Sequence, residues 1–180
     1  MIASLLVAIL TGVLFASFFL PLRAVGAGRR ELAGLEETAV FLGRLSEEVA
    51  GVYPEEQGFT GFPDAVSFVT SAGTNHGLRR TGYQVREVAG EERVGVYRAE
   101  GLPYEEIDLD GGVAVFQADR LVFRYYDGKE WLDEWDRPEI PRLVSLEMAN
   151  RGREFQCLFR PRAGADSDAD PDRGPGPGGG

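Results

Sequence analysis

The chain has 180 residues, with 29 acidic and 19 basic side chains, a formal net charge of −10 and one cysteine. Its length fits a single domain with appended segments, because typical domains have about 100–150 residues. The acidic balance without a basic cluster argues against a nucleic-acid-binding protein, and the single cysteine excludes an intrachain disulfide and a cysteine-based metal centre.

Residues 1–22 carry no charged side chain and are almost entirely apolar. About 20 such residues cross a hydrocarbon core of roughly 30 Å, so the stretch predicts a transmembrane helix. A cleaved secretory signal is the main alternative, but such signals have a basic region before a shorter apolar core. Pro21 predicts a kink near the end of the span, and Gly12 is a second weak point.

Residues 23–53 continue this helix with an amphipathic pattern, which should end near Gly51 and Pro54. Apolar side chains recur at steps of three and four, while charged residues fill the other faces. The apolar positions are Leu32, Leu35, Ala39, Leu42, Leu45, Val49 and Val52. Arginines follow the apolar span, and the positive-inside rule would keep the acidic body in the cytoplasm unless a basic leader precedes the span.

Residues 59–161 change to a period of two and predict a β-rich domain. The expected fold class is α+β, with the N-terminal helix packed on antiparallel sheets. The candidate strands are Val66–Ser71, Tyr83–Val88, Val94–Ala99, Val113–Phe116, Leu121–Tyr126, Leu143–Ala149 and Glu154–Arg160.

An aromatic and acidic segment follows the fifth of these strands, and Asp127-Gly128 within it predicts a tight turn. The aromatic side chains could form an exposed surface that binds a sugar or a protein. They could also form the local core of a loop held by Pro138 and Pro141, which is the favoured hypothesis. The four candidate residues are Tyr125, Tyr126, Trp131 and Trp135.

The sequence predicts no catalytic, cofactor-binding or metal-binding residue, and hence no enzyme. His76 is the single histidine and lies far from Cys157, so no Ser-His-Asp or Cys-His arrangement has support. Acidic pairs such as Glu105–Glu106 are interpreted as solvated surface. Residues 163–180 predict a disordered tail, whose alternating aspartates lack the central glycine and closing acid of a calcium loop.

The segment Leu121–Trp135, LVFRYYDGKEWLDEW, with Ile140-Pro141 and the strand Ser145–Met148, resembles the J-type minor pseudopilin of bacterial type II secretion. In that family a strand with paired aromatics leads to an Asp-Gly turn, a two-tryptophan loop and a Leu-Pro entry to the next strand. Ile140 stands where that family usually has leucine. The resemblance is most specific between residues 121 and 148.

The opening Met1-Ile2-Ala3 also resembles pilin-like proteins, in which a basic leader ends in Gly-Phe-Thr-Leu-Leu/Ile-Glu before an apolar helix. We therefore expect that Met1 lies just after the processing motif. That placement would supply the basic leader and explain the chargeless start.

The resemblance implies a pilin-like fold and a structural component at the tip of the pseudopilus, which assists export of folded proteins across the outer membrane. It implies a single-pass inner-membrane protein with its body in the periplasm, processed and methylated by the prepilin peptidase. Its partners would be other minor pseudopilins and the major pseudopilin. Residues expected to pack in the membrane and the filament are Met1, Leu5, Ile9, Gly12, Phe15, Phe19 and Pro21.

Other hypotheses stay open. The chain could be a minor pilin of a type IV pilus, because such proteins have the same kind of apolar N-terminal segment. Only the two-tryptophan loop argues against this hypothesis. A membrane-tethered periplasmic binding or sensor domain would use Trp131 and Trp135 to hold a small molecule or glycan. A tethered hydrolase would need convergent carboxylates, which the sequence does not predict.

Overall fold

The computed structural model describes residues 34–55, 58–72 and 77–163. The predicted transmembrane span, His76 and the tail after 163 lie outside the described residues. So do the packing residues expected in that span, which are Met1, Leu5, Ile9, Gly12, Phe15, Phe19 and Pro21. Among the described residues, no helix is both long and apolar enough to cross a membrane.

The chain divides into two compact units, Met1–Val40 and Phe41–Gly180. In the first unit, residues 34–40 are helical, and the Thr38 hydroxyl donates to the carbonyl oxygen of Gly34 over 2.9 Å. In the second unit, the helix continues to residue 50, close to the predicted end.

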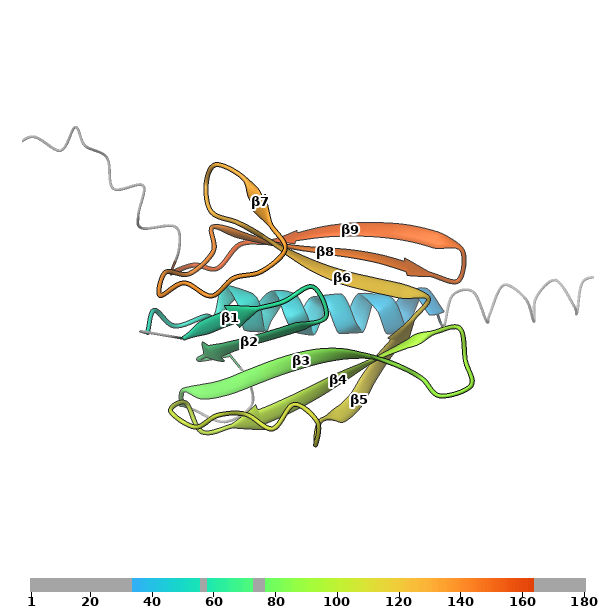
Figure 1. Ribbon diagram of the computed structural model, residues 1–180, viewed down its shortest axis with the longest axis horizontal. Coiled ribbons are helices and arrows are strands. Elements are labelled where there is room, and N and C mark those ends of the chain that lie inside the picture. Colours follow the sequence, from blue (N-terminus) through green and yellow to red (C-terminus); the bar gives the residue numbers. More distant parts are fainter. Residues whose placement is uncertain (1–33, 56–57, 73–76, 164–180) are drawn as a thin grey trace, which may run out of the picture. The chain divides into compact units, whose positions relative to one another are not determined.

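The second unit contains two antiparallel sheets (Figure 1). The larger sheet has the order β1-β2-β3-β4-β5, and the smaller sheet has the order β7-β6-β8-β9. The strands of the first are β1 (Phe59–Gly61), β2 (Ala65–Thr70), β3 (Arg79–Glu87), β4 (Val94–Gly101) and β5 (Val113–Ala118); those of the second are β6 (Arg120–Tyr126), β7 (Trp131–Leu132), β8 (Leu143–Asn150) and β9 (Arg153–Phe159).

All seven predicted strands are present, with ends shifted by a few residues. The sequence pattern missed β1 and β7, which have three and two residues. Both are too short to show a period of two in the sequence. Each forms by pairing with a longer strand: β1 pairs with β2, and β7 pairs with β6 across the Asp127-Gly128 turn.

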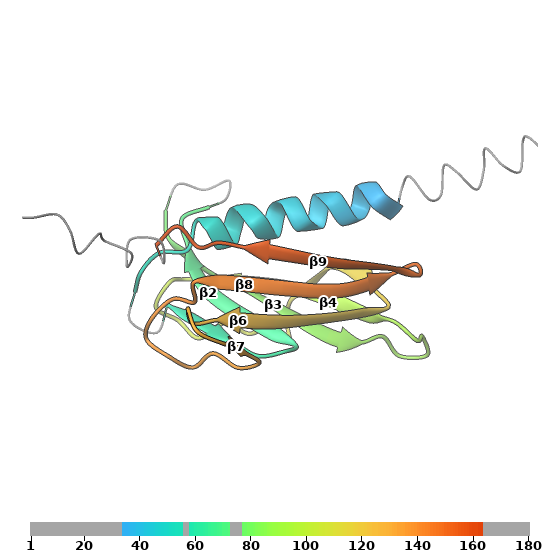
Figure 2. The ribbon, with the colours of Figure 1, turned by 90° about the horizontal axis from the view of Figure 1, so that it is seen from above.

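Residues 41–50 of the helix pack against the strands, as the turned view in Figure 2 shows. Phe41, Leu45 and Val49 are buried at intervals of four residues. Phe41 stacks on Phe116 of β5 with 4.6 Å between ring centroids. The predicted stripe omitted Phe41 and included Ala39, which is exposed. The face of a helix with more apolar surface is the one that is buried. The Phe41 ring has more apolar surface than the Ala39 methyl group, so the Phe41 side of the helix faces the core.

Strand alternation produces the rest of the core. On β6, Leu121, Phe123 and Tyr125 are buried, and on β8 Val144, Leu146 and Met148 are buried opposite them. These side chains share one cluster with the helix residues and with strands of the larger sheet. The protein is therefore α+β, with one helix packed against antiparallel sheets.

Candidate functional site

The aromatic segment is divided by the alternation of β6, which points Tyr125 inward and Tyr126 outward. The Tyr125 ring is fully buried, and its hydroxyl donates to the carbonyl oxygens of Phe62 and Ala65 over 2.9 and 3.2 Å. Burial, reinforced by the nearby Asp64 carboxylate, raises the pKa of Tyr125 well above its usual value. Tyr125 is therefore a neutral core residue that ties β6 to the turn between β1 and β2.

Trp135 is also a core residue, with 2% of its surface exposed. Its backbone exchanges two hydrogen bonds with Gly61, and its indole nitrogen donates to the carbonyl oxygen of Glu139 over 2.7 Å. Position 61 requires glycine, because a Cβ atom added there would overlap the Tyr125 ring. The loop after β7 is thus closed against β1 by a tryptophan that packs inside the domain.

Tyr126 and Trp131 lie on the opposite, outward face of the smaller sheet. They are direct partners in the register between β6 and β7, and their ring centroids are 5.1 Å apart. Trp131 is 36% exposed. The structure therefore places Tyr125 and Trp135 in the core, and the half-buried Tyr126 and the exposed Trp131 on the outward face of the smaller sheet.

The turn between β6 and β7 is built by Asp127 and Gly128. One Asp127 carboxylate oxygen accepts hydrogen bonds from the backbone amides of Lys129 and Glu130 over 2.8 and 3.0 Å, and the other accepts from Arg137 over 3.1 Å. The two amides, with Arg137, hold the pKa of Asp127 below its usual value. Gly128 has φ 104°, a left-handed conformation that favours glycine,.

An open surface pocket of about 670 Å³ lies beside this turn. Its charged lining is balanced between three acidic and three basic side chains, and Asp127 and Arg137 in it already bind each other. The lining residues are Pro54, Glu55, Asp127, Lys129, Trp135, Arg137, Pro138, Glu139, Ile140, Arg142 and Ala163.

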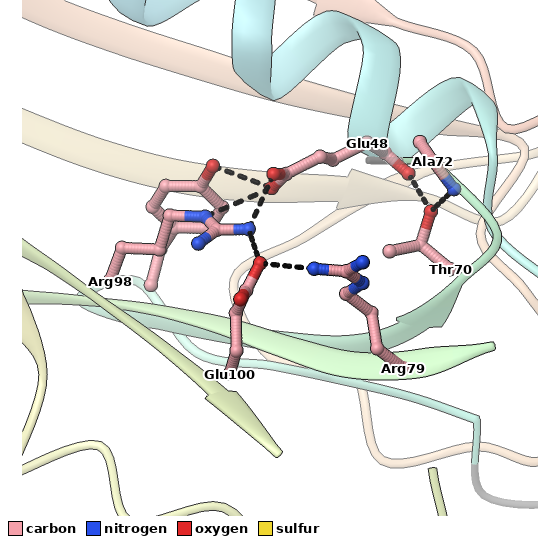
Figure 3. Close-up of polar contacts among 7 residues, drawn as sticks. Glu48, Thr70, Ala72, Arg79, Arg98 and Glu100 are labelled. Atoms are coloured by element: carbon pink, nitrogen blue, oxygen red, sulfur yellow. Dashed lines mark hydrogen bonds and ion pairs between the residues drawn. The ribbon is translucent and has the colours of Figure 1, made fainter. Parts of the chain in front are cut away.

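A buried charged network joins the helix to the larger sheet (Figure 3). Glu48 accepts hydrogen bonds of 2.6 Å each from the Tyr83 hydroxyl and from the Arg98 guanidinium. Arg98 also contacts Glu100, which forms a second ion pair with Arg79 at 2.9 Å. Glu48 is the buried acid of the network and Glu100 lies at the surface. The charge of the buried Glu48 is balanced by Arg98, and that of Glu100 is shared between Arg98 and Arg79,.

A second contact strengthens this connection, because the Thr70 hydroxyl on β2 donates to the backbone oxygen of Glu48 over 2.8 Å. Burial and the Glu48 charge raise the pKa of Tyr83 well above its usual value, so the hydroxyl remains a donor. The arrangement fixes the orientation of the helix on the sheet.

Sequence reasoning missed this network, although one signal was present. Glu48 lies three residues after Leu45 and four before Val52, on the face that the apolar pattern buries. A charged residue at such a position requires a buried partner. The partners are 35 and 50 residues away in the chain, so their identity was not predictable from local patterns.

Within the described part of the chain, the acidic pairs and Cys157 are not assembled into a site. Among the described residues, no three His, Cys, Asp or Glu side chains come together in a group that could hold a metal ion. Glu105 and Glu106 are exposed, and Asp133 binds Arg124 at the surface over 2.9 Å. Cys157 is half-buried on β9, and burial raises the pKa of its thiol.

No protein-family model matches the chain. No curated protein matches it either. Among solved structures, the chain is similar to one in the crystal structure of the GspK-GspI-GspJ complex from the enterotoxigenic Escherichia coli type 2 secretion system. The identity is 16% and the TM-score 0.55, and the match covers 72% of this chain and 97% of that chain. The likeness is one of fold, and the described domain is pseudopilin-like.

Proposed function

We propose that the protein is a minor pseudopilin of a type II secretion system, of the J type, with a structural role at the tip of the pseudopilus. The observation that carries this proposal is the shared fold with a chain of the GspK-GspI-GspJ complex over 97% of that chain. The same complex supports the proposal that other pseudopilins are the partners of this protein.

The two-tryptophan loop supports the J type in particular. Its residues form a distinct element of the domain: Tyr125 and Trp135 close the loop against β1, and Asp127 with Gly128 forms the turn. This is the part of the sequence with the most specific resemblance to that family.

In the proposed mechanism, residues 1–22 anchor the protein in the inner membrane and later pack among the helices of the filament, with the domain in the periplasm. The prepilin peptidase would process and methylate the precursor. The subunit makes and breaks no bond itself. The Glu48–Arg98 pair and the apolar contacts of Phe41 and Leu45 would transmit movement of the helix to the domain as the filament grows.

Deletion of the natural gene in its own bacterium tests the proposal. We expect the proteins normally secreted in folded form to disappear from the medium and to accumulate in the periplasm, and the full natural gene to restore secretion. In detergent extracts, the tagged full-length protein should co-purify with pilin-like subunits encoded by the same organism.

Unchanged secretion after deletion, together with no pilin-like protein in the purified material, would contradict the proposal. Loss of secretion without co-purification would contradict the proposed filament partners.

A further inference from the structure

The segment between β4 and β5, residues 102–112, presents large apolar side chains to solvent. Tyr104 is 81% exposed and Leu102 is 62% exposed. Single exposed apolar side chains are ordinary on protein surfaces. The contacts and charges around these two residues make this segment different.

The segment is held firmly on the outer face of the larger sheet by two arginines. Arg80 donates to the carbonyl oxygen of Pro103 over 3.1 Å, and Arg86 donates to those of Leu109 and Asp110 over 2.8 and 3.2 Å. The Arg86 guanidinium also stacks on the Tyr97 ring at 4.1 Å.

Packing holds the segment as well, because Leu109 lies so close to Gly82 that an added Cβ there would overlap its side chain. A surface held in one conformation loses little conformational entropy when a partner binds.

These arginines bind backbone oxygens and form no ion pair with the carboxylates of the segment, although one Asp108 oxygen accepts hydrogen bonds from the backbone amides of Asp110 and Gly111. The exposed acidic residues are Glu105, Glu106, Asp108 and Asp110, and within the described part of the chain none of them forms an ion pair. Four negative charges thus lie beside two apolar anchors and form no ion pair within the described part of the chain. Such a surface repels anionic lipid surfaces and nucleic acids and attracts a basic protein surface.

A hollow of about 460 Å³ adjoins the same segment. Its lining includes Leu78 and Leu102, the two acids Glu100 and Glu105, and Arg79, which is paired with Glu100. This combination suits a lysine or arginine, whose alkyl part packs on apolar surface while its charged head reaches an acid. Glu100 is already bound to Arg79, so Glu105 is the carboxylate left to meet such a head.

We propose that this segment is a docking surface for a basic segment of a partner protein. Leu102 and Tyr104 provide the apolar anchors, the four carboxylates steer the partner, and the hollow receives a lysine or arginine side chain. This inference goes beyond the proposed function and does not depend on it.

Photo-crosslinking in the natural host tests the inference with the full-length protein. The probe is p-benzoylphenylalanine placed at Tyr104, and the matched control places it at Tyr53, which is 47% exposed and lies three residues after the helix ends. We expect irradiation to give a defined protein adduct only from position 104, attached to a partner peptide rich in lysine or arginine. The double variant Glu105→Lys with Glu106→Lys should lower the adduct yield by about tenfold or more, because like charges then face each other. Acidic substitutions at the mapped partner residues should restore it.

Thermal unfolding of the double variant shows whether its fold is retained, and we expect no change because both side chains are exposed. Equal yields from positions 104 and 53, adducts with lipid, attachment to an acidic or neutral peptide, or a yield insensitive to charge reversal would each overturn the inference. These outcomes are independent of whether deletion of the gene stops secretion.

Discussion

The carboxylate of Glu48, on the helix, accepts a 2.6 Å hydrogen bond from the hydroxyl of Tyr83, on β3. Both residues are buried, and Arg98 supplies the charge that balances the carboxylate. This contact therefore couples the helix to the larger sheet.

Replacement of Glu48 by glutamine should destabilise the protein by about 2–4 kcal/mol, because it leaves the Arg98 charge buried without its partner. Chemical unfolding of the full-length protein in detergent, followed by circular dichroism, measures this change. The Glu47→Gln control should stay within about 0.5 kcal/mol of the unmodified protein. Equal stability of both variants would show that the ion pair contributes nothing to the fold.

The coupling between Glu48 and Tyr83 can be measured separately with a double-mutant cycle. Tyr83→Phe removes only the hydroxyl, and we expect a loss of about 1–3 kcal/mol, as for a hydrogen bond to a charged group. In the Glu48→Gln background, the same substitution should cost less, because the charged acceptor is already absent. Strictly additive losses would contradict a direct interaction.

Glu100 predicts a dependence of stability on pH. Partial burial acts to raise its pKa, but hydrogen bonds from Arg98 and Arg79 outweigh it and hold the pKa below the ordinary value of 4.5. Because the pKa of Glu100 is lower in the folded state, its ion pairs contribute fully to the free energy of unfolding above about pH 4.5. This contribution is lost as the pH falls through the folded-state pKa.

The difference in unfolding free energy between the unmodified protein and Glu100→Gln should therefore shrink between pH 6 and strongly acidic conditions. Unfolding curves at a series of pH values measure it. A difference that stays constant over that range would contradict the assigned ion pairs.

Substitution by alanine should change the stability of the protein in opposite directions at Gly61 and at Gly43. Gly61→Ala should destabilise the protein by about 1–3 kcal/mol, because the new methyl group overlaps the Tyr125 ring,. Gly43 is exposed on the helix, and beyond its own helix backbone and chain neighbours no atom of the described residues lies within 4 Å of an added Cβ, so Gly43→Ala should stabilise the protein by about 0.5–1 kcal/mol,. Thermal melting of both variants measures the two changes in stability. Shifts of the melting temperature in the same direction for both variants would contradict the described packing.

Trp135 and Trp131 should differ in their contribution to stability and in their accessibility to a fluorescence quencher. Trp135→Phe removes a buried hydrogen bond and leaves a cavity, so we expect a loss of about 2–3 kcal/mol,. Trp131→Phe should change stability by about 0.5 kcal/mol or less, because that ring is at the surface. In fluorescence, iodide should quench Trp131 and leave Trp135 largely unquenched. Equal quenching of the two residues would place Trp135 outside the core.

Much of the fold could be predicted from the sequence because it depends on local geometry. The alternation in Leu121–Tyr126 predicts a strand with Leu121, Phe123 and Tyr125 on one face, and Asp127-Gly128 predicts the turn that follows. The helical period predicts that Leu45 and Val49 are buried. Each of these features follows from backbone periods of 2 and 3.6 residues or from the φ values a turn requires.

The tertiary structure alone decided which distant residues meet. It divided the aromatic segment, placing Trp135 against Gly61 and Trp131 beside Tyr126. It selected Tyr83 and Arg98 as the partners of Glu48, and it held residues 102–112 against the outer face of the larger sheet. The physical reason is that a residue's own period determines which face it occupies, whereas its partner depends on strand order and register over the whole sheet.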